Sequence, residues 1–166
     1  MRPDTNAAAG LSRGSLTAEP DRFSDAAWDL LLASQEQARR WRHGEMDVEH
    51  LLQVLLSDAR FARWIDPLPL DPDRLLDQLD DFCADQPTSS SRDLYIGEAL
   101  EELLAAADRC CADWQAPLID LPQLLLALLE EPRIGAELLA DQGLSRDLLS
   151  RQWRPAAAPV VAASAP

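Results

Sequence analysis

The 166-residue sequence contains no lysine, because all 15 of its basic residues are arginine, against 29 acidic residues. Without an ε-amino group the chain can form no Schiff base, and it lacks the lysine that P-loop nucleotide hydrolases place on the phosphates of ATP. A formal net charge of −14 disfavours nucleic acid as a partner, since phosphate backbones are bound through clustered cations. It disfavours a polybasic contact with a membrane surface for the same reason.

Cysteines and long apolar runs are also scarce. Cys83, Cys110 and Cys111 form an odd set without Cys-x-x-Cys spacing, so the sequence indicates neither a disulfide framework nor a zinc site. The longest apolar run, 124–129, is far shorter than the roughly 20 residues that span a bilayer, and the first twenty residues lack the apolar segment of a signal peptide. We therefore expect a cytoplasmic protein without a membrane partner, bound metal or cofactor.

The spacing of apolar residues predicts an all-α fold made of two similar halves. A helical face that includes Ala27 recurs at Ala99, 72 residues later, and each long helix is followed by a short apolar helix that starts at Asp47 or Asp120. Two further short helices complete each half, and no segment alternates apolar and polar residues for long enough to predict a strand. The sequence thus predicts eight helices in two pseudo-twofold-related four-helix repeats.

Composition divides the chain into repeats and tails. Residues 1–21 mix proline, alanine, glycine, serine and threonine without periodicity, and residues 154–166 are rich in alanine and proline, so both are predicted to be flexible tails. A run of turn-forming residues at 86–93 is predicted to link repeat one, residues 22–85, to repeat two, residues 94–153.

Four segments together carry a resemblance to a known family: RFSDAA at 22–27, EHLLQVLL at 49–56, LYIG at 94–97 and QLLLALL at 123–129. Across residues 22–153 the chain resembles the N-terminal domain of the Clp unfoldases, a double Clp repeat, and is most similar to the ClpB branch. The resemblance implies a non-catalytic module that binds unfolded or aggregated protein clients, or docks on Clp-family ATPase or protease subunits. The family's ATPase modules do not follow residue 153, so we consider both a free-standing accessory protein and the N-terminal fragment of a ClpB-type disaggregase.

The resemblance also implies a polar ligand pocket. In the ClpC-like branch, positions that correspond to Ser24 and Glu49 line pockets for modified or unfolded clients, and here they would jointly hold a guanidinium or phosphorylated guanidinium group. The second repeat offers Ile96 and Gln123 instead, so at most one such pocket is expected. The alternative is that Ser24 is simply an N-cap and Glu49 a first-turn anion that favours the helix dipole.

A second candidate surface is apolar. ClpB-type domains bind apolar segments in a groove between the halves, and Leu104, Ala107 and Leu124 fall at positions that would border it; alternatively, residues at this helical spacing belong to the core. Trp64 is a further candidate for partner binding, because it shares a short arginine-flanked helix with Phe61, a composition favoured at interfaces.

Three remaining features each have a plain alternative. His43 and His50 lie among carboxylates, but not at the His-Glu-x-x-His spacing of a zinc enzyme. Cys110 and Cys111 would need a nearby base to act as nucleophiles, and small packing residues are the simpler interpretation. The acidic stretch 66–85 is either a solvated face or a docking surface for a basic partner.

Overall fold

The computed structural model describes residues 15–153, and the predicted tails at 1–14 and 154–166 lie outside the described residues. The described chain begins with two 3-10 turns, η1 (Leu16–Ala18) and η2 (Pro20–Arg22). Ser15 and Thr17 are buried there, and their hydroxyl groups hydrogen-bond to each other at 2.7 Å. Residues 15–21 therefore belong to the folded domain and not to a tail, because these turns bury polar side chains that the composition alone assigned to one.

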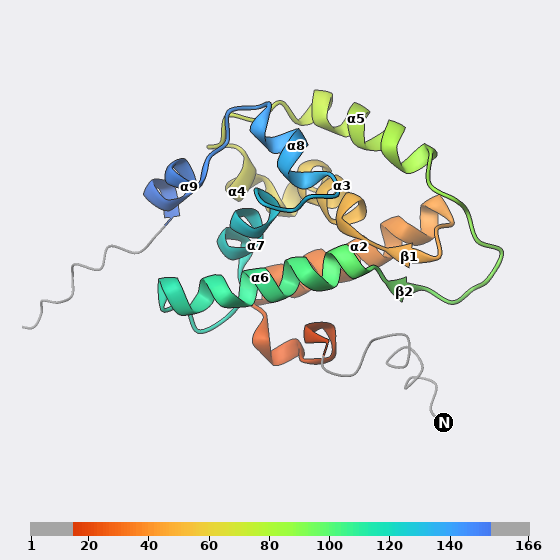
Figure 1. Cartoon of the computed structure of the whole chain (residues 1–166), viewed down its shortest axis with the longest axis horizontal. Helices are drawn as coiled ribbons and strands as arrows, with labels where there is room; N and C mark the ends of the chain where they lie inside the picture. Colours follow the sequence, from red (N-terminus) through yellow and green to blue (C-terminus); the bar gives the residue numbers. More distant parts are fainter. Residues whose placement is uncertain (1–14, 154–166) are drawn as a thin grey trace, which may run out of the picture.

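Eight α-helices follow in two sets of four (Figure 1). The first set is α2 (Asp25–Trp41), α3 (Val48–Ser57), α4 (Ala62–Ile65), which follows the 3-10 turn η3 (Ala59–Phe61), and α5 (Pro72–Ala84). The second set is α6 (Glu98–Trp114), α7 (Leu121–Leu128), α8 (Gly135–Ala140) and α9 (Arg146–Trp153). The predicted all-α double repeat is confirmed.

The helix ends repeat as closely as the helices do. The long helices α2 and α6 both end at a residue in the left-handed conformation, Arg42 with φ 63° and Gln115 with φ 54°. The short apolar helices α3 and α7 both begin with a capping box, built by Asp47 and by Asp120. In each pair the two positions differ by 73 residues, so the structural repeat has a period of 73 in this part of the chain.

Two short strands join the halves. Strand β1 (Glu45–Met46) runs parallel to β2 (Tyr95–Ile96), and Met46 lies opposite Ile96. A matching parallel bridge connects Phe23 to Ile119. The sequence predicted no strand, because two residues are too few to show an alternating pattern. Each pairing joins one half to the other, so the halves interlock rather than meet at a simple interface.

The core is built around α3 and α7, whose residues are nearly all buried. In the first half α3 packs against α2 and α5, and in the second half α7 packs against α6 and α9. Figure 1 shows α5 along one side of the molecule and α6 along the opposite side. Burial of leucine side chains contributes about 2 kcal/mol each. This continuous core fixes the position of the outer helices and of the turns between them.

Candidate functional site

An aspartate from the opposite half lies at the start of each long helix. Ser24 Oγ accepts the amide of Ala27 at 3.1 Å, which caps α2, and donates to Asp120 Oδ1 at 2.7 Å. At the other junction Asp47 Oδ1 accepts the amides of Val48 and Leu100, each at 2.9 Å. Asp47 therefore caps its own helix, α3, and also caps α6 of the other half.

Gly97 explains why the two junctions differ. It is the N-cap residue of α6, as Ser24 is of α2, and it supplies no side chain for capping. A Cβ at this position would lie 2.1 Å from Asp47 Oδ2. The Asp47 carboxylate thus occupies the space that a capping side chain at position 97 would need.

This geometry corrects the predicted correspondence between the repeats. The counterpart of Ser24 is Gly97 and not Ile96, because Ile96 takes the place of Phe23 in the strand-like pairing. The same period of 73 residues makes Pro122, and not Gln123, the counterpart of Glu49. Both assignments were wrong by one residue. The second repeat has lost the hydroxyl and the carboxylate, as predicted, but at different positions.

Glu49 lies buried at the first turn of α3 and pairs with an exposed arginine of the other half. Arg133 Nε donates to Glu49 Oε1 at 3.1 Å and Arg133 Nη2 donates to Oε2 at 3.0 Å, which is a bidentate pair. The guanidinium also lies over the Phe82 ring at 5.2 Å from its centroid. Hydrogen bonding to Glu49 raises the pKa of Arg133, so this cation stays charged.

Ser24 and Glu49 do not share a pocket. Glu49 lines a cavity of about 320 Å³ beneath the segment that links the halves, together with His43, Gln86 and Arg133. Ser24 lines a different cavity of about 300 Å³, with Asp120 and Trp153. The prediction of a joint site was wrong, because each residue contacts a partner from the opposite half instead of the other.

Leu104, Ala107 and Leu124 are core residues. Their exposed fractions are 1%, 0% and 0%, so they present no surface to a client. The prediction that they border a client groove was wrong, because α7 packs against this face of α6 and covers it. The adjacent positions Leu103 and Ala106 border an open depression instead.

This depression is a trough of about 660 Å³ between α6 and the turn that joins α7 to α8. The accessible part of its apolar lining is made of Ala99, Ala106 and Pro132, and the buried residues Leu103 and Ala127 lie at its floor. Charged side chains surround this lining, most of them glutamates. Its position beside α6 depends on how α7 packs against that helix, so the spacing of apolar residues alone does not give it.

The turn at the closed side of the trough is fixed by a buried carboxylate. Glu131 Oε1 accepts the amides of Ile134 at 2.9 Å and Gly135 at 2.8 Å, and its Oε2 accepts the amide of Arg133. The turn before α8 is therefore held in one conformation. Its rigidity gives the trough a defined wall and holds Arg133 against Glu49.

His43 and His50 form a buried hydrogen-bonded chain. The Asp47 amide donates to His50 Nδ1 at 2.9 Å, and His43 Nε2 lies 3.1 Å from the Cys83 carbonyl oxygen. These outer contacts require His50 Nε2–H to donate to His43 Nδ1, at 2.8 Å. Burial lowers the pKa of His50 to about 4. All four ring nitrogens are engaged within the domain, which leaves no lone pair for a metal.

The vicinal thiols lack the surroundings of a nucleophile. Cys111 is buried and its Sγ donates to the Leu118 carbonyl oxygen at 3.4 Å. Burial raises the pKa of Cys111 to about 11, and it raises the pKa of Cys110 as well. Both thiols are thus protonated at neutral pH, and the two histidines are engaged elsewhere, next to Cys83. The geometry supports packing rather than catalysis.

Trp64 is half-buried on α4. Its ring lies 6.4 Å from the Phe61 ring and carries the Arg63 guanidinium 4.2 Å above it. Phe61 and Ile65 are buried and close the core of the first half. A role for Trp64 in partner binding stays a prediction.

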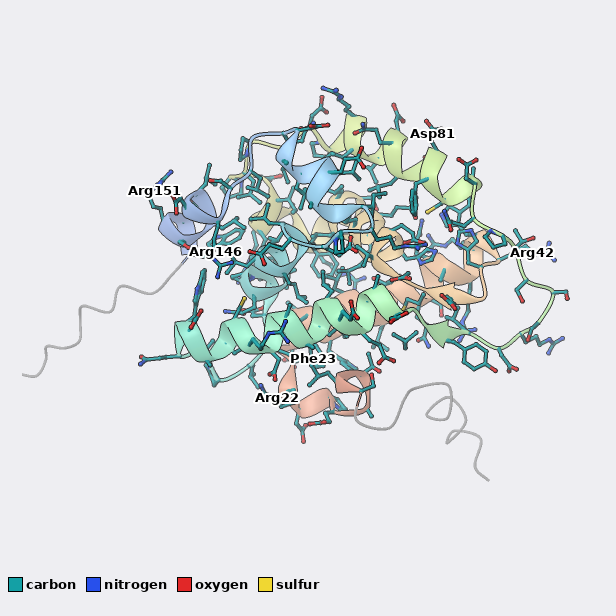
Figure 2. The ribbon with its side chains drawn as sticks, in the orientation of Figure 1. Arg22, Phe23, Arg42, Asp81, Arg146 and Arg151 are labelled. Carbon is teal, nitrogen blue, oxygen red and sulfur yellow. The ribbon has the colours of Figure 1, made fainter. Side chains whose placement is uncertain are left out.

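The acidic stretch forms the outer side of α5. Figure 2 shows Asp81 projecting from this helix away from the core, while Leu75, Leu79 and Cys83 are buried beneath it. This places the stretch on an exposed helix face, and its role as a docking surface for a basic partner stays a prediction.

Two interlocked four-helix repeats around one core define a double-repeat α-helical domain. The chain matches the family model of the Clp repeat (R) N-terminal domain over residues 22–142. It belongs to this family, as the resemblance predicted. A domain of this family is a non-catalytic module of Clp ATPases.

Similar proteins agree with this assignment. The chain is 59% identical over 143 residues to Chaperone protein ClpB 2 of Parasynechococcus marenigrum (strain WH8102), which covers 86% of this chain and 16% of that protein. Its fold is similar to that of the Hsp104 N-terminal domain from Candida albicans, with a TM-score of 0.65 and 15% identity over 78% of this chain and 87% of that one. It is also similar to the N-terminal domain of the ClpV1 ATPase from E. coli, with a TM-score of 0.65 and 24% identity over 88% and 86%.

The chain thus spans about one sixth of the length of its ClpB relative. Among the helices within residues 15–153, none has the length and apolarity needed to cross a bilayer.

Proposed function

We propose that this domain is a non-catalytic protein-interaction module of the cytoplasmic Clp and ClpB chaperone system. It binds segments of client proteins, or docks on a Clp-family ATPase or protease assembly, through the trough along α6. The observation that carries this proposal is the open trough of about 660 Å³, with its apolar lining on a rigid helical wall. ATP-driven work on the client is done by Clp ATPase modules, in the same chain or in a partner.

The walls of the trough favour recognition through side chains. Both α6 and α7 satisfy their backbone hydrogen bonds internally, so an incoming segment finds no strand edge to extend. Ala99 and Ala106 are half-buried and lie two helical turns apart, and their small side chains let another backbone approach closely. Apolar residues of a client would lose contact with water here, while its polar groups stay at the rim.

Blocking the trough tests the proposal. Ala106→Trp would fill it, and Ala112→Trp is the matched control, because Ala112 is an exposed alanine of the same helix that does not line the trough. Binding of fluorescein-labelled, reduced and carboxymethylated α-lactalbumin is measured by fluorescence anisotropy. We expect Ala106→Trp to weaken binding at least tenfold and Ala112→Trp to bind as the wild type does. Equal affinities for the three proteins would refute the trough as the client surface.

A second candidate function rests on the Glu49 carboxylate. Its bidentate contact with Arg133 demonstrates complementarity to a guanidinium group. We propose, as the alternative, that a client's modified arginine competes with Arg133 for this carboxylate. Calorimetry with phosphoarginine should then give heats for the wild type that Glu49→Ala abolishes. Indistinguishable heats for the two proteins eliminate this pocket as a receptor.

A further inference from the structure

The rim of the trough is charged unevenly along α6. Glu45, Glu98 and Glu102 are exposed and gather where α6 begins. Glu98 and Glu102 are one helical turn apart, which places them roughly 6 Å from each other along the axis. Within residues 15–153, none of these three carboxylates forms an ion pair. This end of the trough therefore presents negative charge that no side chain of the domain neutralises.

The opposite end carries the opposite sign. Arg109 lines the trough eleven residues after Glu98, which corresponds to about 16 Å along a helix. Among the other charged residues that line the trough, Arg133 pairs with Glu49, Asp47 and Glu131 are buried, and Glu130, whose side chain is 75% exposed, contacts Arg146 at 3.5 Å. On α6 itself the exposed charges are thus acidic at the start of the helix and basic at Arg109, with the apolar lining between them.

We propose that the trough selects protein segments with basic residues at one end of a short apolar stretch, and fixes the direction in which they lie. This inference rests on the proposed function of the same trough. Basic side chains of the segment lie over Glu45, Glu98 and Glu102, and its apolar residues cover Ala99 and Ala106. Arg109 repels a second basic group and attracts an acidic one, so a segment with basic residues only at the wrong end is rejected.

The size of the trough limits the segment that it can hold. About 16 Å accommodates roughly eleven helical residues or five extended ones. Complementary charges within a Debye length of about 8 Å raise affinity at physiological salt, and more so at lower salt. The acidic face of α5, by contrast, offers negative charge without an apolar lining, which is why we place the basic partner in the trough.

Charge exchange tests the inference. The probes are two fluorescein-labelled twelve-residue peptides with the same Leu/Ala centre, one with two lysines at its first end and a glutamate at its last, and one with these charges inverted. We expect the wild type to prefer the first peptide by about tenfold in 50 mM salt. Glu98→Gln with Glu102→Gln should remove most of this preference, and Glu98→Lys with Glu102→Lys should reverse it.

A matched control removes two carboxylates elsewhere. Glu36→Gln with Glu137→Gln changes two exposed glutamates outside the trough, on α2 and α8, and should keep the wild-type preference. Equal binding of both peptides to wild type and to Glu98→Lys with Glu102→Lys, combined with loss of binding in Ala106→Trp, would overturn the charge selection and leave the proposed function intact. Binding unaffected by Ala106→Trp would overturn both. Circular dichroism confirms that each variant is folded.

Discussion

Asp47 is a single residue on which two helices depend. Its Oδ1 atom accepts amides from α3 and α6, and its Oδ2 atom lies where a Cβ at Gly97 would be. The glycine is required here for close approach and not for its backbone angle, since its φ of −70° suits any residue. A buried carboxylate that loses such contacts leaves unsatisfied amides behind, each at a cost of about 1–3 kcal/mol.

We therefore expect Gly97→Ala to destabilise the domain by about 2–4 kcal/mol, because Asp47 must move away and uncap α6. Gly97→Ser brings in the same Cβ and also displaces Asp47, but it should be milder than Gly97→Ala, since its hydroxyl can replace Asp47 as the cap of α6, as Ser24 caps α2. Chemical denaturation of the three proteins measures the order. Gly44→Ala is the control, because its Cβ meets only the Ser89 side chain, at 3.3 Å. Equal stability of Gly97→Ala and Gly44→Ala would contradict the cap.

His50 shows how a buried histidine makes stability depend on pH. The folded state holds it neutral, because protonation of Nδ1 would remove the acceptor for the Asp47 amide. Burial lowers its pKa from 6.5 to about 4, so between these values the unfolded chain binds a proton that the folded domain does not. The stability that His50 contributes is complete above pH 6.5 and is lost as the pH falls towards 4.

Asp47 contributes the opposite dependence. Burial, with the charge of Glu49 second, raises its pKa from 3.8 to about 6. The folded domain then binds the extra proton, so this contribution is complete below pH 3.8 and is lost as the pH rises through 6. The two dependences partly cancel between pH 4 and 6, and a comparison of variants is needed to separate them.

His50→Gln makes that comparison, because Gln123 fills the same capping-box position in the second repeat. We expect the stability of the wild type relative to His50→Gln to increase by up to about 3 kcal/mol from pH 4 to pH 6.5. Urea denaturation of both proteins at half-unit pH intervals measures it, and contributions from the exposed carboxylates, which do not contact His50, cancel in the difference. A difference that stays constant across this range would show that His50 does not titrate differently on folding.

At the scale of elements, the features that the sequence predicted correctly are those that depend on neighbouring residues in the chain. The long helices and the aspartate caps at Asp47 and Asp120 follow from apolar spacing and capping residues within a few positions. The strands β1 and β2 could not be predicted, because each has two residues and its partner lies in the other half. Pairings of this kind leave no periodic signal in either segment.

The site was predicted less accurately because its register depends on contacts between elements. Ile96 was expected to correspond to Ser24, but it takes the structural place of Phe23, so the counterparts moved by one residue. The predicted groove residues were displaced in the same way. Leu104 and Ala107 are covered by α7, whereas the preceding residues, Leu103 and Ala106, line the trough. Neighbouring residues of a helix differ by about 100° in direction, and only packing decides which side stays open.

At the scale of the whole molecule, the two repeats share one structure. Arg133 of the second half neutralises Glu49 of the first, and Arg22 of the first half pairs with Asp108 of the second, below α6 in Figure 2. The β1 and β2 pairing and the Phe23 bridge to Ile119 add backbone contacts across the same boundary. If one half unfolded alone, the other half would lose its helix caps, the ion pair with Glu49 and its strand partners.

We therefore expect the described domain to unfold as one cooperative unit, which hydrogen exchange can test. Phe61 lies in the first half, is 1% exposed, and its replacement by alanine should cost about 3–5 kcal/mol. If the halves are coupled, amides of α7 lose the same protection as amides of α3, because both exchange only through global unfolding. Ile65→Val, a milder change in the same half, gives the same comparison at about 1 kcal/mol if Phe61→Ala is too unstable. Retained protection in α7 while α3 loses it would show that the repeats are separate folding units, and the trough wall would then survive damage to the first half.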